Sequence, residues 1–185
     1  MNQRDSQLLV SSAFGPFDPL APALAAGVFA RNLVAPAIDI RAPVELVWQV
    51  MTDFDDYPQW NPLNRFFRLD GRAEPGHSVT FGPCWGPYHA DGALPEADMT
   101  TRETITVWER NRCLAYGDLR RLFKAERAQY LQPLADGRTR YHTFERICGP
   151  LAPLVRLVFG QRIIRGFTAN GVALKVRAES MAARP

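Results

Sequence analysis

The side chain best placed to do chemistry is Glu145, which lies in a segment of alternating residue types at 139–148. That alternation puts four side chains on one face of an expected strand: Tyr141, Thr143, Glu145 and Ile147. A carboxylate that faces an apolar cavity has a raised pKa and can act as a general acid or base. Arg127 on the neighbouring expected strand could instead form a structural ion pair with Glu145. The structural pair is the favoured interpretation, because buried ionic pairs are common without catalysis.

Metal and nucleotide chemistry have little support in the sequence. His77, Cys84, His89 and Asp91 fall within fifteen residues, but their spacing matches no pattern of metal ligands. The chain has no GxSxG motif, no glycine-rich phosphate loop and no paired-cysteine motif, which argues against hydrolases, nucleotide-binding proteins and zinc fingers. We therefore predict no metal site and no cofactor.

Composition is typical of a folded globular protein. The 185 residues are 46% hydrophobic and 22% charged, with a formal net charge of +3. The arginines are scattered rather than gathered in a basic stripe, so we expect no binding of nucleic acid. The three cysteines form no CxxC pair, which favours a reducing compartment. The longest apolar run, at 19–30, is too short to span a bilayer, and we expect a cytoplasmic protein, monomeric or homodimeric.

Two parts of the chain differ in character. Residues 1–35 form an N-terminal extension in which Asp18 and Pro19 resemble the start of a short helix that reaches Asn32. Residues 36–180 form a single domain. Its first strand begins at Ala37, and a helix follows from Pro43.

From residue 65 onward, the period of two predicts a run of antiparallel strands. Turn residues separate them, and no helix-length crossover intervenes. The expected strands are 65–71, 77–82, 102–109, 112–119, 125–132 and 139–148. The connection at 83–100 is longer and rich in proline, glycine and aromatic residues, so it is a candidate lid or binding loop.

A long helix is expected at about 151–180. Spacings of three and four predict one buried face made of Leu157, Gly160, Ile164, Phe167, Gly171, Leu174 and Ala178. Each glycine inside a helix costs about 1 kcal/mol relative to alanine, so something on this face requires space. Either the helix lies very close to the sheet, or a void for a ligand lies beside it.

The chain resembles the START/polyketide-cyclase-like helix-grip superfamily (SRPBCC), and in particular its uncharacterised bacterial members. The resemblance rests on residues 38–43 with Val47 and Trp48, on 52–62, on 136–149 and on 165–175, and it covers about four fifths of the chain. It implies an α+β helix-grip fold: a curved antiparallel sheet wrapped around a long C-terminal helix, with two short helices after the first strand. The sheet and that helix would enclose a ligand cavity, with the face of Glu145 turned inward.

That cavity defines the expected site. The residues expected to bind a ligand are Trp60, Asn61, Glu103, Ile105, Leu114, Tyr116, Arg127, Tyr141, Thr143, Glu145, Ile147, Phe167 and Asn170. For Trp60 and Asn61, a packing or capping role is at least as well supported. Histidines often stand at the positions of Arg127 and Thr143 in similar bacterial sequences, and this departure weakens any acid–base role carried over from them.

Two functions follow from the resemblance. The first is binding of an apolar small molecule, lipid-like or aromatic and polyketide-like, by a carrier or sensor. The alternative is an enzyme of the polyketide cyclase/dehydratase kind, in which Glu145, Arg127 or Tyr116 transfers protons. The sequence leaves open whether any reaction is catalysed.

Overall fold

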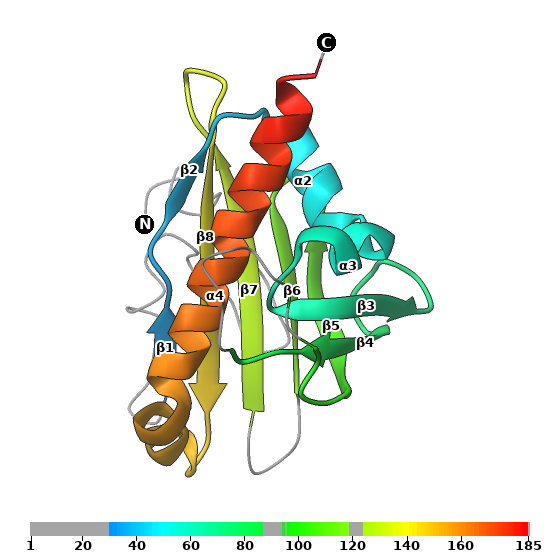
Figure 1. Ribbon diagram of the computed structural model, residues 1–185. Helices are drawn as coiled ribbons and strands as arrows, with labels where there is room; N and C mark the ends of the chain where they lie inside the picture. Colours follow the sequence, from blue (N-terminus) through cyan, green and yellow to red (C-terminus); the bar gives the residue numbers. More distant parts are fainter. Residues whose placement is uncertain (1–29, 87–93, 95, 119–123, 185) are drawn as a thin grey trace, which may run out of the picture.

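The computed structural model describes residues 30–86, 94, 96–118 and 124–184. They form an antiparallel sheet and a small set of helices (Figure 1). The strands are β1 (Ala30–Val34), β2 (Ile38–Ile40), β3 (Asn64–Asp70), β4 (Ser78–Pro83), β5 (Thr101–Glu109), β6 (Cys113–Asp118), β7 (Lys124–Pro133) and β8 (Thr139–Cys148). The helices are α2 (Val44–Thr52), the 3-10 turn η1 (Phe54–Asp56), α3 (Tyr57–Trp60) and α4 (Ala152–Ala182).

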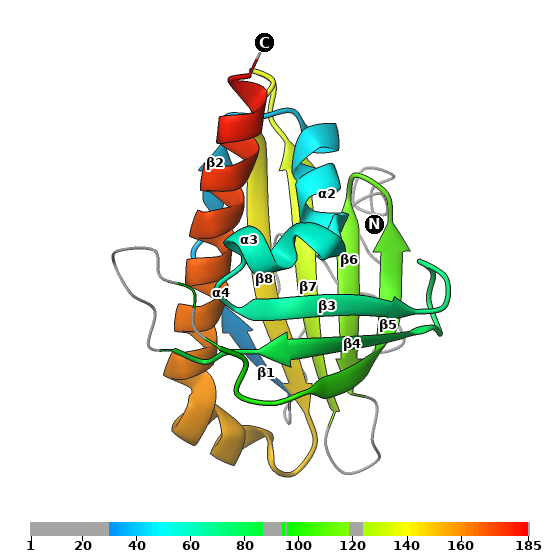
Figure 2. The same cartoon turned by 45° about the vertical axis from the view of Figure 1, so that its right-hand side comes forward.

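The sheet has the order β1-β8-β7-β6-β5-β4-β3, and β2 also pairs with β8. Every pairing is antiparallel, as expected for strands joined by hairpins. Strands β3 and β4 run across the direction of β6 to β8, so the sheet curls around the helices (Figure 2). The helix-grip α+β fold is therefore confirmed.

Strand β1 differs from expectation. The predicted N-terminal helix reached Asn32, whereas residues from Ala30 to Val34 form a strand whose partners on β8 run from Cys148 to Phe144. The rest of that predicted helix lies outside the described residues. Pairing with β8 satisfies the backbone donors and acceptors of an edge that would otherwise be open, which outweighs the local helical preference.

Helices α2, α3 and α4 lie on the same side of the sheet (Figures 1 and 2). We call this side the inner face. Its main core is aromatic: the rings of Trp48 and Trp108 lie 5.6 Å apart, and those of Phe54 and Phe67 lie 4.4 Å apart. Rings at these separations contribute beyond their buried area, so this cluster fixes α2 and η1 against β3 and β5.

The glycines of α4 allow it to lie close to the sheet. A Cβ added at Gly171 would come within 2.8 Å of Ile38 Cδ1 and 3.1 Å of Tyr141 Cε1, and one at Gly160 within 3.2 Å of Leu33 Cδ2. Of the two interpretations, close packing therefore explains these glycines. The prediction that Leu157 is buried was wrong, because 83% of it is exposed. The lower end of α4 extends to the margin of the sheet, where the buried stripe passes through Ile163 instead (Figure 1).

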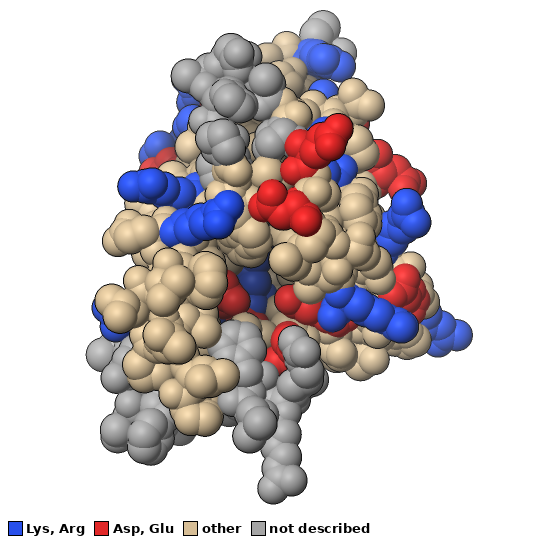
Figure 3. Space-filling view, turned by 60° about the horizontal axis from the view of Figure 1, so that its bottom comes forward, with Lys and Arg blue, Asp and Glu red and all other residues tan. Residues whose placement is uncertain are grey.

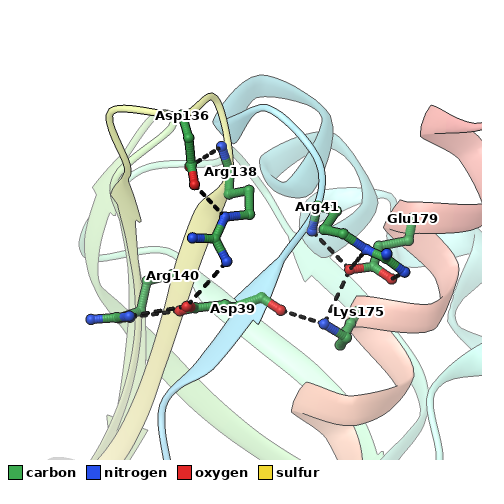
Figure 4. Close-up of polar contacts among 7 residues, drawn as sticks. All are labelled: Asp39, Arg41, Asp136, Arg138, Arg140, Lys175 and Glu179. Carbon is green, nitrogen blue, oxygen red and sulfur yellow. Dashed lines mark hydrogen bonds and ion pairs between the residues drawn. The ribbon is translucent and has the colours of Figure 1, made fainter.

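Polar contacts hold the other end of α4 (Figure 4). The Glu179 carboxylate accepts a hydrogen bond from the Arg41 backbone N–H at 2.8 Å and pairs with Lys175 at 3.1 Å. Lys175 also donates to the Asp39 backbone carbonyl, while the Asp39 carboxylate pairs with Arg140 of β8 at 2.6 Å. Strand β2 is thus joined to both α4 and β8. None of the helices in the described ranges is long and apolar enough to cross a membrane.

Candidate functional site

A buried guanidinium lies at the centre of the inner face. Arg127 extends from β7 and is only 6% exposed. It donates to Asn170 Oδ1 of α4 at 2.7 Å, to Tyr116 Oη of β6 at 3.3 Å, and to Thr143 Oγ1 and Tyr141 Oη of β8 at 3.4 and 3.5 Å. The Phe167 ring lies 4.3 Å from its guanidinium carbon, as in a cation–π contact. Neutral groups thus surround a side chain that stays protonated.

The Tyr116 hydroxyl receives two of the donors at this centre. Arg127 donates to it, and the Asn64 amide donates from the start of β3 at 3.4 Å. Both contacts use the phenol oxygen as acceptor, so the phenol proton remains to be donated. Burial raises the pKa of Tyr116, although the charge of Arg127 opposes this effect. Tyr116 is therefore a neutral hydrogen-bond donor at ordinary pH.

Glu145 lies directly opposite Arg127 in the β7–β8 register. The expected structural ion pair is not formed: in the part of the chain that the structure describes, no hydrogen bond or ion pair joins these two side chains. Burial raises the pKa of Glu145 to about 7, and the nearby charge of Arg127 only partly opposes this effect. The carboxyl group therefore keeps its proton to a higher pH than an exposed glutamate does.

Two adjoining pockets open beside these residues. The inner pocket has a volume of about 120 Å³. Its polar lining includes Arg127 and Tyr116, which contact each other, and Glu145. The outer pocket encloses about 450 Å³ between α4 and the 84–100 connection, with mainly apolar walls. Trp85, Met99 and Glu145 line both, so the two are continuous. Seen from the end where α4 begins, the surface is hollowed, with acidic and basic side chains inside the hollow (Figure 3).

The two ends of the 84–100 connection are fastened beside the outer pocket. The Asp98 carboxylate accepts a hydrogen bond from the Trp85 backbone N–H at 2.8 Å, and the Asp98 N–H donates to the Pro83 carbonyl at 2.8 Å. Arg162 of α4 donates to the Trp85 carbonyl at 3.1 Å. This part of the candidate lid is therefore attached to α4. Residues 87–93 and 95 of the candidate lid lie outside the described residues.

The structure brings together a subset of the residues expected to bind a ligand. Five of them line the inner pocket: Glu103, Tyr116, Arg127, Glu145 and Phe167. Three others contact the Arg127 guanidinium: Tyr141, Thr143 and Asn170. The remaining five do not line either pocket: Trp60, Asn61, Ile105, Leu114 and Ile147.

Those five residues have structural contacts instead. The Asn61 amide oxygen accepts from the backbone N–H groups of Leu63 and Asn64 at 3.0 and 2.8 Å, which fixes the turn from α3 into β3. Trp60, Ile105 and Leu114 belong to the main core, and Ile147 belongs to a second cluster between β1 and α4.

Several pocket residues were not predicted. Val155, Phe159 and Ile163 of α4 line the outer pocket at a spacing of four, and the same stripe continues to Phe167. The sequence does contain a signal for them: steps of four residues from Phe167 toward the N-terminal end of the helix reach all three positions. Asn64 carries no such signal, because its position depends on the turn after α3.

The candidate metal ligands do not come together where they are described. His77 contacts Glu74 at 3.1 Å at an exposed turn, and Cys84 is buried beyond β4. His89 and Asp91 lie outside the described residues.

Comparisons with known proteins agree with this fold. The Zhui aromatase/cyclase from Streptomyces sp. R1128 superposes with a TM-score of 0.62 at 15% identity, over 83% of this chain and 96% of that one. A START superfamily protein from Mycobacterium smegmatis superposes with a TM-score of 0.57 at 17% identity, over 82% and 98% of the two chains.

Sequence comparison identifies the family. No protein with a curated description matches the chain. The family described as polyketide cyclase/dehydrase and lipid transport matches residues 33–179, which include every strand but the start of β1 and nearly all of α4. This chain therefore belongs to the polyketide cyclase/dehydrase and lipid transport family.

Proposed function

We propose that the chain binds an apolar small molecule, lipid-like or aromatic and polyketide-like, and works as a carrier or sensor. The observation that carries this proposal is the pair of continuous pockets: mainly apolar walls outside, and a small polar centre inside. Small-molecule sites usually combine a hydrophobic lining with few, well-placed polar groups. The apolar part of the ligand would occupy the outer pocket.

The inner pocket suits a ligand that carries an oxygen acceptor. Tyr116 and Arg127 are donors at one wall, and a carbonyl or phenolic oxygen would accept hydrogen bonds from them. A hydrocarbon would give the Tyr116 hydroxyl proton no acceptor in the pocket, which lowers its affinity.

Native mass spectrometry of freshly purified protein tests for a bound molecule, and displacement of the apolar fluorophore N-phenyl-naphthylamine tests the pocket directly. Phe159→Ala should weaken fluorophore binding about 3- to 10-fold, because it removes apolar contact area in the outer pocket. Leu157→Ala is the matched control on the same helix, since Leu157 does not line that pocket. Equal binding by both variants, or no binding by the unmodified chain, would contradict the proposal.

The oxygen acceptor has its own test. Tyr116→Phe keeps the ring and removes only the hydroxyl, so affinity for naphthol should fall about 2- to 10-fold while affinity for naphthalene stays constant. Tyr130→Phe alters a buried tyrosine outside both pockets and should change neither. A loss of the same size for both ligands would show that Tyr116 only shapes the pocket.

One observation favours a second candidate, an enzyme of the cyclase/dehydratase kind. Glu145, with a pKa of about 7, shares the inner pocket with the Tyr116 and Arg127 donors. In an aldol cyclisation, Glu145 would accept the proton from a carbon between two carbonyls, while Tyr116 and Arg127 stabilise the enolate oxygen. The enolate carbon would then bond to a second carbonyl carbon, whose oxygen takes up the proton.

Glu145→Gln separates the two candidates. With a synthetic poly-β-ketone thioester, this variant of an enzyme would lose turnover and keep binding of the fluorophore. A carrier or sensor would show no cyclised product with either the unmodified chain or the variant.

A further inference from the structure

The start of α4 exposes a group of large apolar side chains to solvent. Its members lie close together in the sequence: Leu151, Leu154, Leu157, Val158 and Phe159. Their exposed fractions run from 48% for Phe159 to 83% for Leu157. Soluble proteins rarely expose neighbouring apolar side chains on this scale, and where they do, the surface marks an interaction site.

Exposed arginines accompany these side chains. Arg156 lies among them in the sequence, and Arg162 and Arg165 follow Val158 at helical spacing on the same outward face of α4. We call the five apolar residues and these three arginines the α4 patch. Within the ranges that the structure describes, no carboxylate pairs with any of the three arginines. The sequence contains no acidic residue between Glu145 and Glu179, so the α4 patch is apolar and positively charged.

The acidic residues of the adjoining outer pocket come from other elements. Asp98 belongs to the 84–100 connection, and its carboxylate accepts a hydrogen bond from the Trp85 backbone N–H. Glu145 belongs to β8 and also lines the inner pocket. Both line the pocket and not the outward face of α4, so they leave the positive charge of that face in place.

We propose that the α4 patch docks on the surface of a phospholipid bilayer that contains anionic lipids. Apolar side chains of a helix at such a surface enter the boundary between headgroups and acyl chains, and basic side chains are attracted to the anionic headgroups. The apolar part of the patch extends along about 13 Å of helix, which is enough to enter this boundary and too short to cross the bilayer.

Charge and position argue against a second copy of the chain as the partner. A twofold contact would bring the same arginines of both copies together, and like charges across an interface repel. The patch also lies where α4 begins, at one end of the molecule (Figures 1 and 2). A fluid lipid surface adapts to a helix end, whereas a protein partner needs a complementary shape.

The α4 patch adjoins the mouth of the outer pocket. Phe159 and Arg162 belong to both, and Met99, which is 57% exposed, lines the opposite wall. Docking would therefore place the pocket mouth beside the lipid and give an apolar ligand a direct path between the bilayer and the pocket. The docking itself does not depend on which ligand the pocket holds.

Co-sedimentation with vesicles tests the apolar part of the patch. The full chain should bind vesicles of phosphatidylcholine with about 30% phosphatidylglycerol at least about 10-fold more strongly than vesicles of phosphatidylcholine alone. Leu154→Gln combined with Leu157→Gln should weaken binding at least about 10-fold, because both side chains would enter the interface. Val172→Gln combined with Val176→Gln is the matched control, since these valines are exposed further along the same helix.

The charged part has a separate test. Arg156→Gln combined with Arg165→Gln should weaken binding to the mixed vesicles about 10- to 25-fold and remove most of its dependence on NaCl concentration. Arg162 is left intact, because it also donates to the Trp85 carbonyl. Arg184→Gln changes an exposed arginine beyond the other end of α4 and should leave vesicle binding unchanged.

Binding of N-phenyl-naphthylamine without vesicles distinguishes this proposal from the proposed function. Leu154 and Leu157 line neither of the two pockets, so the leucine variant should bind the fluorophore as the unmodified chain does, which also shows that it is folded. If it does not fold, Leu157→Gln alone repeats the test at the more exposed position. Vesicle binding by a chain that binds no fluorophore would contradict the proposed function and support the docking.

Three results would overturn the docking. One is a loss of vesicle binding that is equal in the leucine and valine variants. Another is a dimer in sedimentation that the leucine substitutions dissociate and that binds no vesicles, because a second copy would then cover the patch. The third is a monomeric chain that binds neither kind of vesicle, which would leave an acidic protein as the partner.

Discussion

At the scale of single residues, burial of the charged Arg127 side chain requires desolvation free energy that its contacts must offset. Taking a guanidinium out of water is expensive unless its donors are satisfied, and here four neutral oxygens and one aromatic ring provide that compensation. A carboxylate partner would neutralise the charge of the guanidinium and occupy its donors. Because Glu145 does not form that bond, the positive charge remains available to a ligand oxygen.

Glu145 should make folding stability depend on pH. Its pKa is raised from an ordinary value of 4.5 to about 7, so the folded state holds a proton that the unfolded state releases between these values. Stability therefore falls as pH rises from about 4.5 to 7 and levels off above. Glu145→Gln should abolish this loss, so between pH 5 and pH 8 the variant should gain about 2 kcal/mol relative to the unmodified chain.

Denaturant unfolding at the two pH values measures this difference. Glu45→Gln, which removes an exposed carboxylate of α2, is the matched control for the same substitution at the surface. A Glu145→Gln profile parallel to that of the unmodified chain would show that Glu145 is ionised in the folded state.

At the scale of elements, strand alternation could be read from the sequence because it depends only on neighbouring residues. It placed Tyr141, Thr143, Glu145 and Ile147 together on one face of β8, and all four lie on the inner face. Predicted strand limits agree with the observed ones to within one residue at nearly every end. The absence of an ion pair between Arg127 and Glu145 could not be predicted from strand alternation, because Asn170 and Tyr116 accept from the guanidinium and come from other elements.

Long-range pairing explains the errors in element prediction. Strand β1 exists because β8 offers an unpaired edge, which lies more than a hundred residues away in the chain. The burial of Leu157 depends on where α4 meets the margin of the sheet, and helical spacing alone does not contain that information.

The glycines of α4 lead to a prediction about helix packing. Gly171→Val should destabilise the fold by about 2 kcal/mol, because the added methyl groups overlap Ile38 and the Tyr141 ring. Gly160→Ala meets the flexible end of Leu33 at 3.2 Å and, at an ordinary contact distance of 3.6 Å, Arg156 Cγ, and the higher helical propensity of alanine offsets these contacts. Thermal unfolding of both variants measures the contrast, and equal losses would mean that α4 shifts away from the sheet without cost.

Over the whole molecule, the contacts around Glu179 join the two ends of the domain sequence. They hold the last turns of α4 against β2, and through Asp39 against β8 (Figure 4). The bond from the Arg41 backbone N–H, together with contacts to Arg41 and Lys175, lowers the pKa of Glu179 to about 2.

This network predicts a loss of stability in acid. Because its folded pKa is lowered, Glu179 stabilises the fold above about pH 4.5, and this contribution is lost as pH falls toward 2. Glu179→Gln should therefore cost about 1 kcal/mol at pH 7, allowing for solvent screening, and progressively less as pH is lowered from 4.5 toward 2. Denaturant titrations of the variant and of Glu45→Gln across this range provide the comparison. A cost for Glu179→Gln that is the same at every pH would mean that the contacts act by shape alone.

The close approach of α4 to the sheet at Gly171 also decides how ligands would compete. Tyr141 and Ile38 fill the space beneath that turn, so the described pockets extend from Phe167 toward the first turns of α4 and not past Gly171. A molecule that enters there meets a closed end and must leave by the way it came. Two different ligands would then exclude one another, and a displacement titration should follow a strictly competitive, one-site isotherm.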